Sequence, residues 1–400
     1  MKNEKQEYFK VAVLVAISCV LQISESLIPN PIPGLKLGLA NIITLIVLFR
    51  MGFKYALEIA IFRTVLSSFI MGTFLSPAFI LSLSGAVGST FVMGSLLWLS
   101  RNTVFKTGII VISIIGALVH NIVQLYTAYG ILLHHRGIFM FLPWLCTGSV
   151  IMGWLTGTVS QNVCRNLRDI EERKFYGSDD LTAQGMISSQ IFYSSNSFLH
   201  RMKGELKLSG MFLIAVSILF FKKWLIIGFF YLLIISLIYF SGLSYRNILK
   251  KMYRYASLLI FSFLLPVFFN SGTHSLFYIA SFNITFEGIE TGLYFAGQIS
   301  LLIMLSIVLG MTTSGEELTR SFAFFMSPLK YFGVSDKRIS GILSISIILI
   351  PVFLEITGKI INTSAIKNVK SLRNFIPALS NVIEKVYLES ERKRNYDFVQ

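Results

Sequence analysis

Ionisable and amide side chains interrupt several long apolar runs of the sequence, and their types are suited to binding a ligand. Glu58 and Arg63 lie in one run, and His120, Asn121 and Gln124 lie in another. Charged and strongly polar groups inside a membrane-length apolar segment are costly, so they usually have a function there. Together these groups predict a substrate site that hydrogen-bonds a heterocycle or a headgroup. The alternative is a set of ordinary hydrogen bonds between helices.

The chain that must position these residues is very apolar. Of its 400 residues, 54% are hydrophobic and only 14% are charged, and the mean hydropathy is +0.70. A soluble domain carries about 25% charged residues. The composition therefore predicts an integral membrane protein.

Apolar runs of roughly 20 residues can cross a hydrocarbon core about 30 Å thick. The first half of the chain contains six such runs, at residues 10–28, 36–50, 55–72, 78–99, 107–130 and 139–160. The second half contains four more and a weaker fifth, at residues 208–221, 224–243, 256–270, 288–311 and 339–356. The runs lack the alternation of barrel strands, which indicates helices. The predicted fold class is all-α, a polytopic integral membrane protein with about ten or eleven transmembrane helices.

The distribution of Lys and Arg predicts the orientation in the membrane, because these residues concentrate in cytoplasmic loops. Basic residues precede the first run, follow the sixth and fill residues 320–394, whereas the loop 271–288 has none. We therefore expect a cytoplasmic N-terminus, cytoplasmic C-terminal helices and an external loop 271–288. This orientation favours a surface helix over a span at 339–356. Contact with anionic lipid, rather than with nucleic acid, then explains the net charge of +15.

Two further patterns limit the chemistry. Cys19, Cys146 and Cys164 lack the spacing of metal or redox motifs and are predicted to be packing residues. The sequence also contains no GxxxxGK[ST] phosphate loop. We therefore predict no metal and no cofactor, and any ATP hydrolysis would require separate subunits.

Two blocks of the second half carry a resemblance to a known family. They are "SFLHRMKGELKLSG" (197–210) and "MTTSGEELTRSFAFFMSPLKYFGVSDKRISGILSISIILIPVFLEI" (311–356), in which Ser314 is a predicted helix cap followed by Glu316 and Glu317. Residues 195–400 resemble the transmembrane T component of energy-coupling factor (ECF) transporters. The resemblance implies cytoplasmic amphipathic coupling helices that contact two ATPase subunits through Ala-Arg-Gly-like motifs.

This chain departs from that family pattern at the coupling motifs. Aligned from Glu355, the first motif falls on Ala365, Ile366 and Lys367, which lack the Arg. The second falls on Arg394, Asn395 and Tyr396, which lack the Gly. Glu355, Ala365 and Arg394 are therefore the candidate coupling residues, and the altered motifs leave open whether an ATPase docks. The alternative for Arg394 is a solvated basic helix end.

The first half carries a second resemblance, over residues 9–165. The blocks "IPGLKLGLANI" (32–42), "FRTVLSSFIMGTFLSP" (62–77), "LSLSGAVGS" (81–89) and "GALVHNIVQL" (116–125) resemble the Gx transporter family, also called component I of heptaprenyl diphosphate synthase. Six spans also suit the substrate-binding S component of ECF transporters. That likeness implies that Ala12 and Ala16 face the T component, although small residues four apart are also common in ordinary packing.

The predicted organisation has three parts: a six-helix S-like domain (1–165), a cytoplasmic linker (166–206) and a T-like domain with coupling helices (207–400). The resemblances imply a non-enzymatic subunit of a transporter in the bacterial inner membrane. Its partners would be ATPase subunits, and its substrate a small vitamin-like or lipophilic molecule, such as a flavin or an isoprenoid or quinone precursor. The alternatives are a non-catalytic membrane anchor and a component of a redox or prenyl diphosphate synthase system. The DDxxD motifs of prenyl synthases are missing from the sequence.

Overall fold

The computed structural model describes residues 2–26, 38–102, 107–133, 136–172, 202–221, 223–253, 255–270, 272–279, 282–325, 336–363, 377 and 380. The first half consists of α1 (Lys2–Ser26), α2 (Leu39–Arg50), α3 (Phe53–Met71), α4 (Pro77–Asn102), α5 (Ile109–Thr127), a π turn (Ala128–Leu133), a 3-10 turn (Arg136–Phe141) and α6 (Leu142–Glu172). The second half consists of α8 (Gly204–Phe220), α9 (Trp224–Phe240), α10 (Tyr245–Tyr253), α11 (Ala256–Phe269), β1 (Ser275–Ile279), β2 (Phe282–Thr285), α12 (Phe286–Thr312), α13 (Gly315–Phe325) and α14 (Asp336–Thr363). The all-α membrane fold is therefore confirmed.

The described part of each predicted apolar run lies mainly in a helix, but not every helix has the length and composition of a span. Six described helices are long and apolar enough to cross a membrane, or seven if α10 and α11 count as one bent span. The helix α2 has 12 residues, which is about 18 Å at 1.5 Å per residue. Lys54, Glu58 and Arg63 make α3 more polar than an ordinary span. The expected ten or eleven spans thus include helices that complete the bundle without the length or apolarity to cross alone.

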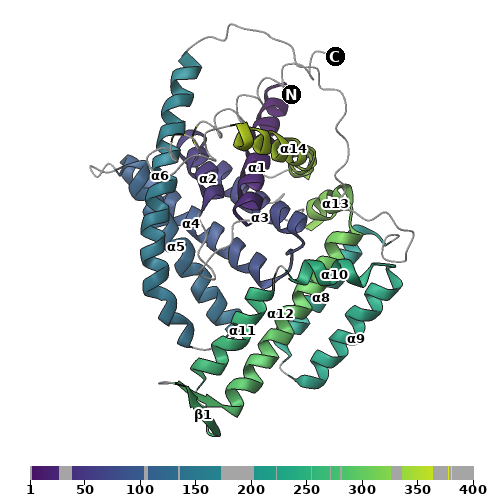
Figure 1. Cartoon of the computed structure of the whole chain (residues 1–400). Coiled ribbons are helices and arrows are strands. Elements are labelled where there is room, and N and C mark those ends of the chain that lie inside the picture. The colour runs from purple at the N-terminus through teal and green to yellow at the C-terminus, as the bar shows by residue number, and fades with distance from the viewer. Residues whose placement is uncertain are drawn as a thin grey trace.

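The loop 271–288 contains a β-hairpin that the hydropathy pattern did not predict. Strands β1 and β2 pair antiparallel, with Tyr278 opposite Asn283. The hairpin lies at the end of the molecule opposite the N-terminus (Figure 1).

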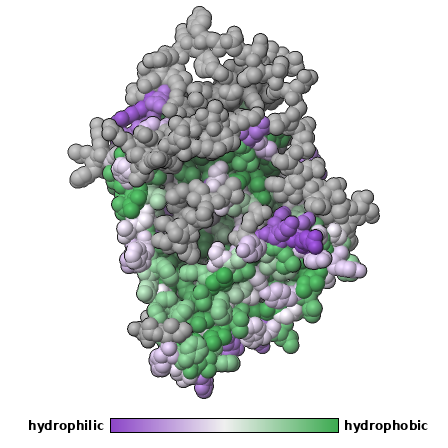
Figure 2. Space-filling view, viewed as in Figure 1, coloured by the Kyte–Doolittle hydropathy of each residue, from purple (hydrophilic) through white to green (hydrophobic). Residues whose placement is uncertain are grey.

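Two helices form the centre of the molecule. Residues 11–21 of α1 and residues 305–312 of α12 are all buried. Apart from Ser18, Ser306 and Thr312, both segments are apolar around their circumference, which is expected of helices enclosed by others. Figure 2 shows that the surface formed by α8, α9, α11 and α12 is mainly hydrophobic, as expected of a face in contact with lipid.

The two halves of the chain pack directly on each other. Helix α14 from the second half contacts α1 from the first, at the end where the N-terminus lies (Figure 1). A second contact joins the end of α3 to α12, where a Cβ on Gly310 would lie 3.5 Å from the carbonyl oxygen of Phe69. The Tyr255 hydroxyl also donates to the carbonyl of Met71 at 3.1 Å. The contacts between the halves therefore involve α1 and α3 on one side and α12 and α14 on the other.

Close packing of α5 on α6 positions the polar residues of the first half. A Cβ on Gly153 would lie 2.6 Å from the Cα of Ile114, and one on Gly157 would lie 2.8 Å from the Cα of Ile110. Glycines four apart allow such an approach of two helix backbones in lipid. The Ser113 hydroxyl thereby comes within 2.9 Å of the Thr156 hydroxyl, and this pair faces the interior of the half.

Candidate functional site

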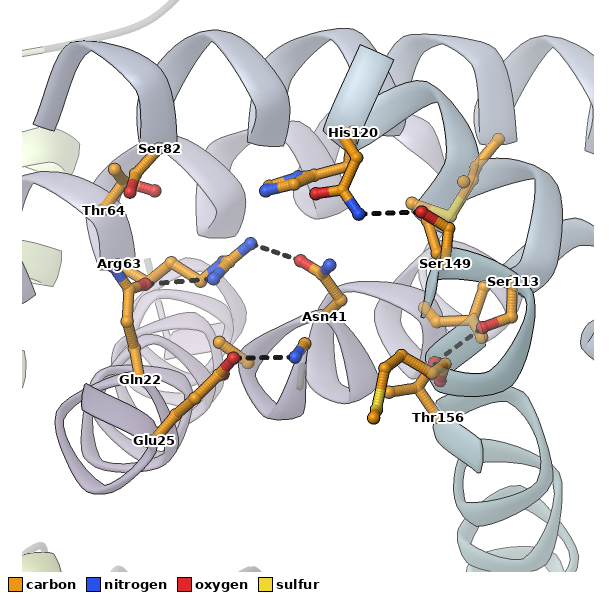
Figure 3. Close-up of a pocket in the computed structure, with 18 residues that line it drawn as sticks. Gln22, Glu25, Asn41, Arg63, Thr64, Ser82, Ser113, His120, Ser149 and Thr156 are labelled. Atoms are coloured by element: carbon orange, nitrogen blue, oxygen red, sulfur yellow. Dashed lines mark hydrogen bonds between the residues drawn. The ribbon is translucent and has the colours of Figure 1, made fainter. Parts of the chain in front are cut away.

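A polar cavity lies inside the first half, and all six of its long helices contribute to the wall. Its volume is about 50 Å³, which is room for a few water molecules at roughly 10–15 Å³ each. Eleven lining residues have polar side chains: Gln22, Glu25, Asn41, Arg63, Thr64, Ser82, Ser113, His120, Asn121, Ser149 and Thr156. All of them except Asn121 are labelled in Figure 3. The other seven are Gly38, Ala40, Leu45, Met93, Gly116, Ala117 and Met152.

Arg63 is the cationic group of the cavity. Its side chain enters from α3, and the residue is only 4% exposed. Nη1 donates to Oε1 of Gln22 at 3.0 Å, and Nη2 donates to Oδ1 of Asn41 at 2.7 Å (Figure 3). The guanidinium group therefore bridges the end of α1 and the start of α2 through two neutral amides.

Glu25 supplies the carboxylate of the cavity wall. Its Oε1 accepts the backbone N–H of Gly38 at 2.8 Å, and its Oε2 accepts that of Leu39 at 3.0 Å. These N–H groups open α2, whose first turn would otherwise leave them without partners. Glu25 therefore caps α2 and fixes the N-terminus of that helix against the cavity.

The three predicted residues of α5 lie together. His120 and Asn121 line the cavity, and Nε2 of Gln124 lies 2.9 Å from Nε2 of His120. Asn121 donates from Nδ2 to the hydroxyl of Ser149 in α6 at 2.7 Å. Gln124 does not line the cavity. It packs against Gly85 of α4 and contacts His120 on the side away from the cavity. Among the described residues, no group of three or more His, Cys, Asp or Glu side chains is arranged to hold a metal ion.

Glu58 lies outside the cavity, which corrects the prediction that it shares a site with Arg63. Five residues on an α-helix correspond to a rotation of about 140°, so the two side chains leave α3 on different faces. Glu58 faces α14, where its Oε1 accepts from Nε of Arg338 at 3.2 Å and its Oε2 accepts from Nη2 at 2.9 Å. Nη1 of Arg338 also lies 3.3 Å from the carboxylate of Glu7. Glu58 therefore belongs to a contact between the two halves.

The residues predicted at the S/T interface lie in the centre of the molecule. Ala12 and Ala16 are fully buried in α1. The carbonyl oxygen of Ala12 accepts a hydrogen bond from the Ser346 hydroxyl of α14 at 3.0 Å. Of the predicted coupling residues, Glu355 lies half-buried in α14, whereas Ala365 and Arg394 lie outside the described residues.

The two sequence blocks of the second half meet in space at Lys207, whose side chain is buried. Nζ donates to the carbonyl oxygen of Thr312 at 2.6 Å and lies 3.4 Å from Oε2 of Glu317. Glu317 and Ser314 form the predicted cap: the Glu317 N–H donates to the Ser314 hydroxyl, and the Ser314 N–H donates to the Glu317 carboxylate, both at 3.2 Å. This capping box starts α13. Lys207 of α8 therefore contacts both the end of α12 and the start of α13.

Sequence reasoning missed several wall residues, although a signal for them was present. Asn41, Thr64 and Ser82 fall within the sequence blocks that carry the first-half resemblance, as do Arg63, His120 and Asn121. All four blocks thus meet at one cavity. Gln22 and Glu25 end the first apolar run, and their polarity was the signal. No sequence signal marked Ser113, Ser149 and Thr156 as wall residues, because isolated hydroxyl groups are common in membrane helices.

The fold and the site define a polytopic membrane protein with two helical halves, one of which encloses a polar cavity. Residues 14–163 match the family model described as heptaprenyl diphosphate synthase component I. Residues 195–392 match the one described as cobalt transport protein. Both resemblances seen in the sequence are therefore confirmed.

Curated relatives of the second half are energy-coupling factor transporter transmembrane proteins EcfT. That of Leuconostoc gelidum subsp. gasicomitatum is 23% identical over 171 residues, which are 43% of this chain and 64% of the relative. That of Staphylococcus aureus is 27% identical over 166 residues, 42% of this chain and 62% of the relative. That of Brevibacillus brevis is 28% identical over 198 residues, 46% of this chain and 73% of the relative. The chain spans just under two thirds of the first of these relatives.

Proposed function

We propose that this chain is the membrane component of an ECF-type transporter, in which the first half binds the substrate and the second half couples it to separate ATPase subunits. The similarity of residues 195–392 to EcfT proteins supports the coupling role. The polar cavity of the first half supports the binding role. In this proposal residues 166–206 connect the two roles; the structure describes α6 as far as Glu172 and α8 from Gly204.

The observation that carries the proposal is the direct contact of α14 with the helices that line the cavity. Arg338 of α14 binds Glu7 at the start of α1 and Glu58 in α3. Further along the same helices, Gln22 and Arg63 hydrogen-bond each other in the cavity wall. A displacement of α14 would therefore shift both helices and alter the cavity. ATPase subunits that move the coupling helices would in this way change the affinity for the substrate.

Affinity purification of the tagged full-length protein in mild detergent tests this function. Mass spectrometry should identify a pair of ATPase subunits. Arg394→Glu should reduce their recovery several-fold, whereas Arg320→Glu, at an exposed position of α13, should not. Recovery of prenyl-transfer or redox proteins without any ATPase would contradict the proposal. That outcome would favour a membrane anchor or a component of a redox or prenyl diphosphate synthase system, the last of which is named in the family description of residues 14–163.

We also propose that the β-hairpin faces the outside of a bacterial cytoplasmic membrane, with the N-terminus and α14 at the cytoplasmic side. The basic loops support this orientation. Tyr278 is 71% exposed on β1, so Tyr278→Cys in a variant without Cys19, Cys146 and Cys164 should react with an impermeant thiol reagent in intact cells. Lys250→Cys, on the exposed face of α10, should react only after permeabilisation. The reverse pattern would invert the topology.

A further inference from the structure

Arg63 gives the cavity a positive charge that no protein carboxylate contacts directly among the described residues. The two partners of its guanidinium group, Gln22 and Asn41, are neutral amides. Its Nε is buried and has no hydrogen-bond partner within the described part of the chain. A buried guanidinium group normally pairs with an anion, because an unpaired buried charge is costly. Arg63 therefore has the capacity to bind an anion that the protein itself does not supply.

Glu25, the one carboxylate among the described residues of the cavity wall, already accepts hydrogen bonds from the start of α2. Each of its oxygens accepts a backbone N–H at the start of that helix. A helix N-terminus carries about half a positive charge, which offsets part of the charge of Glu25. The combined charge of Arg63, Glu25 and the end of α2 is therefore positive, and it favours an anionic ligand.

The cavity wall is unlike a site for a lipophilic or aromatic molecule. Eleven of the 18 lining residues are polar, and the remainder are glycine, alanine, leucine and methionine. No Phe, Tyr or Trp lines the cavity in the described part of the chain. Sites for drug-sized molecules are lined mainly by apolar and aromatic side chains and measure about 300–1,000 Å³. A cavity of about 50 Å³ instead suits a molecule of a few non-hydrogen atoms.

We infer that the ligand of this cavity is a small organic carboxylate, and this inference rests on the proposed binding role of the first half. The carboxylate group binds Arg63 at its Nε and at a remaining N–H of an adjacent Nη. Hydroxyl or carbonyl groups on the rest of the ligand bind Asn121 and the hydroxyl groups around it. A flavin or an isoprenoid precursor fits neither the size nor the polarity of the wall.

The melting temperature of the full-length protein in detergent tests the inference. The probes are carboxylates of two to six carbons, each compared with its uncharged amide, for example lactate with lactamide. At least one carboxylate should raise the melting temperature while its amide does not. An equal response to both would overturn the inference. So would the lack of a response to every carboxylate at about 10 mM, roughly ten times a millimolar Kd.

Two variants identify Arg63 as the group that responds. Arg63→Gln should weaken the apparent affinity roughly tenfold or more, because a hydrogen bond to a charged group is lost. Gln22→Glu places a carboxylate of the same shape on Nη1 of Arg63. It should raise the melting temperature of the ligand-free protein and abolish the response to carboxylates, so its outcome does not depend on whether Arg63→Gln folds. Arg101→Gln, at the exposed end of α4, should respond like the parent protein.

The same preparations separate this inference from the proposed function. Recovery of ATPase subunits without a response to carboxylates would refute the ligand class and leave the transporter proposal standing. A response to carboxylates that Gln22→Glu leaves intact would place the anion elsewhere and would also overturn the inference.

Discussion

Arg338→Glu is expected to destabilise the full-length protein strongly, because it reverses the charge at the contact between the two halves. The Arg338 side chain is 13% exposed and that of Glu58 is 11% exposed. The guanidinium group also lies over two aromatic rings, at 5.5 Å from the centroids of both Tyr8 and Tyr55. Removing one partner of a buried ion pair costs about 3–5 kcal/mol. The variant would place three carboxylates together, so we expect a loss at the upper end of that range.

A charge-swap variant separates the ion pair from general damage to α14. Glu58→Arg alone should also destabilise, because it sets two guanidinium groups against each other. The double variant Arg338→Glu/Glu58→Arg should recover part of the melting temperature, and the double-mutant cycle would measure the coupling between the two positions. Arg320→Glu is the control, since Arg320 and Glu316 form an exposed pair in α13 and such pairs contribute little. Additive losses without recovery would show that this ion pair does not join the halves.

The contacts that could be predicted from the sequence are those with a local signal. The helix cap at Ser314 was predicted from the residue type and the acidic residues that follow it. The structure has Ser314 there, in a capping box with Glu317 whose two hydrogen bonds are both 3.2 Å long. The helices follow from the apolar runs. The cavity was partly predictable, because Arg63, His120 and Asn121 are polar residues inside such runs.

The contacts that could not be predicted join residues far apart in the sequence. Ser346 binds Ala12 across 334 positions, and Arg338 binds Glu58 across 280. Nothing near any of these residues indicates its partner. Glu58 was predicted to lie with Arg63, but a buried carboxylate in an apolar helix signals a partner and not its identity, and the structure pairs Glu58 with Arg338. The rotation of about 140° between positions five apart on a helix already indicated that Glu58 and Arg63 point in different directions.

The sequence also did not predict which helices enclose α1. The sequence placed only Ala12 and Ala16 of this helix at a helix contact, whereas all of residues 11–21 are buried. Its neighbours are α2 and α3 of its own half and α14 of the other. An even distribution of apolar residues around a helix is compatible with lipid or protein on each face, so only the tertiary structure decides between them.

Lys207→Met is expected to destabilise the second half by about 3 kcal/mol, because it leaves a carboxylate and a helix-end carbonyl without their cation. The Lys207 side chain is fully buried, and that of Glu317 is 25% exposed. The carbonyl oxygen of Thr312, at the C-terminus of α12, gains most from a cation, since that helix end carries a partial negative charge. The measurement is the melting temperature of the full-length protein, with Lys250→Met on the exposed face of α10 as the control.

A second substitution tests whether the cost arises from the charge left behind or from the lost side chain. Glu317→Gln preserves the capping box, because glutamine serves at that position as well as glutamate, but it leaves the buried ammonium group with the Thr312 carbonyl alone. Replacing both members of a buried polar pair can be nearly neutral, whereas removing one leaves the other unsatisfied. The double variant Lys207→Met/Glu317→Gln should therefore be more stable than Lys207→Met. If instead Lys207→Met had the melting temperature of the parent protein, the ammonium group of Lys207 in the parent would have to reach water at the membrane surface. Lys207 would then not hold α8 against the junction of α12 and α13, and the first turn of α13 would depend on its capping box alone.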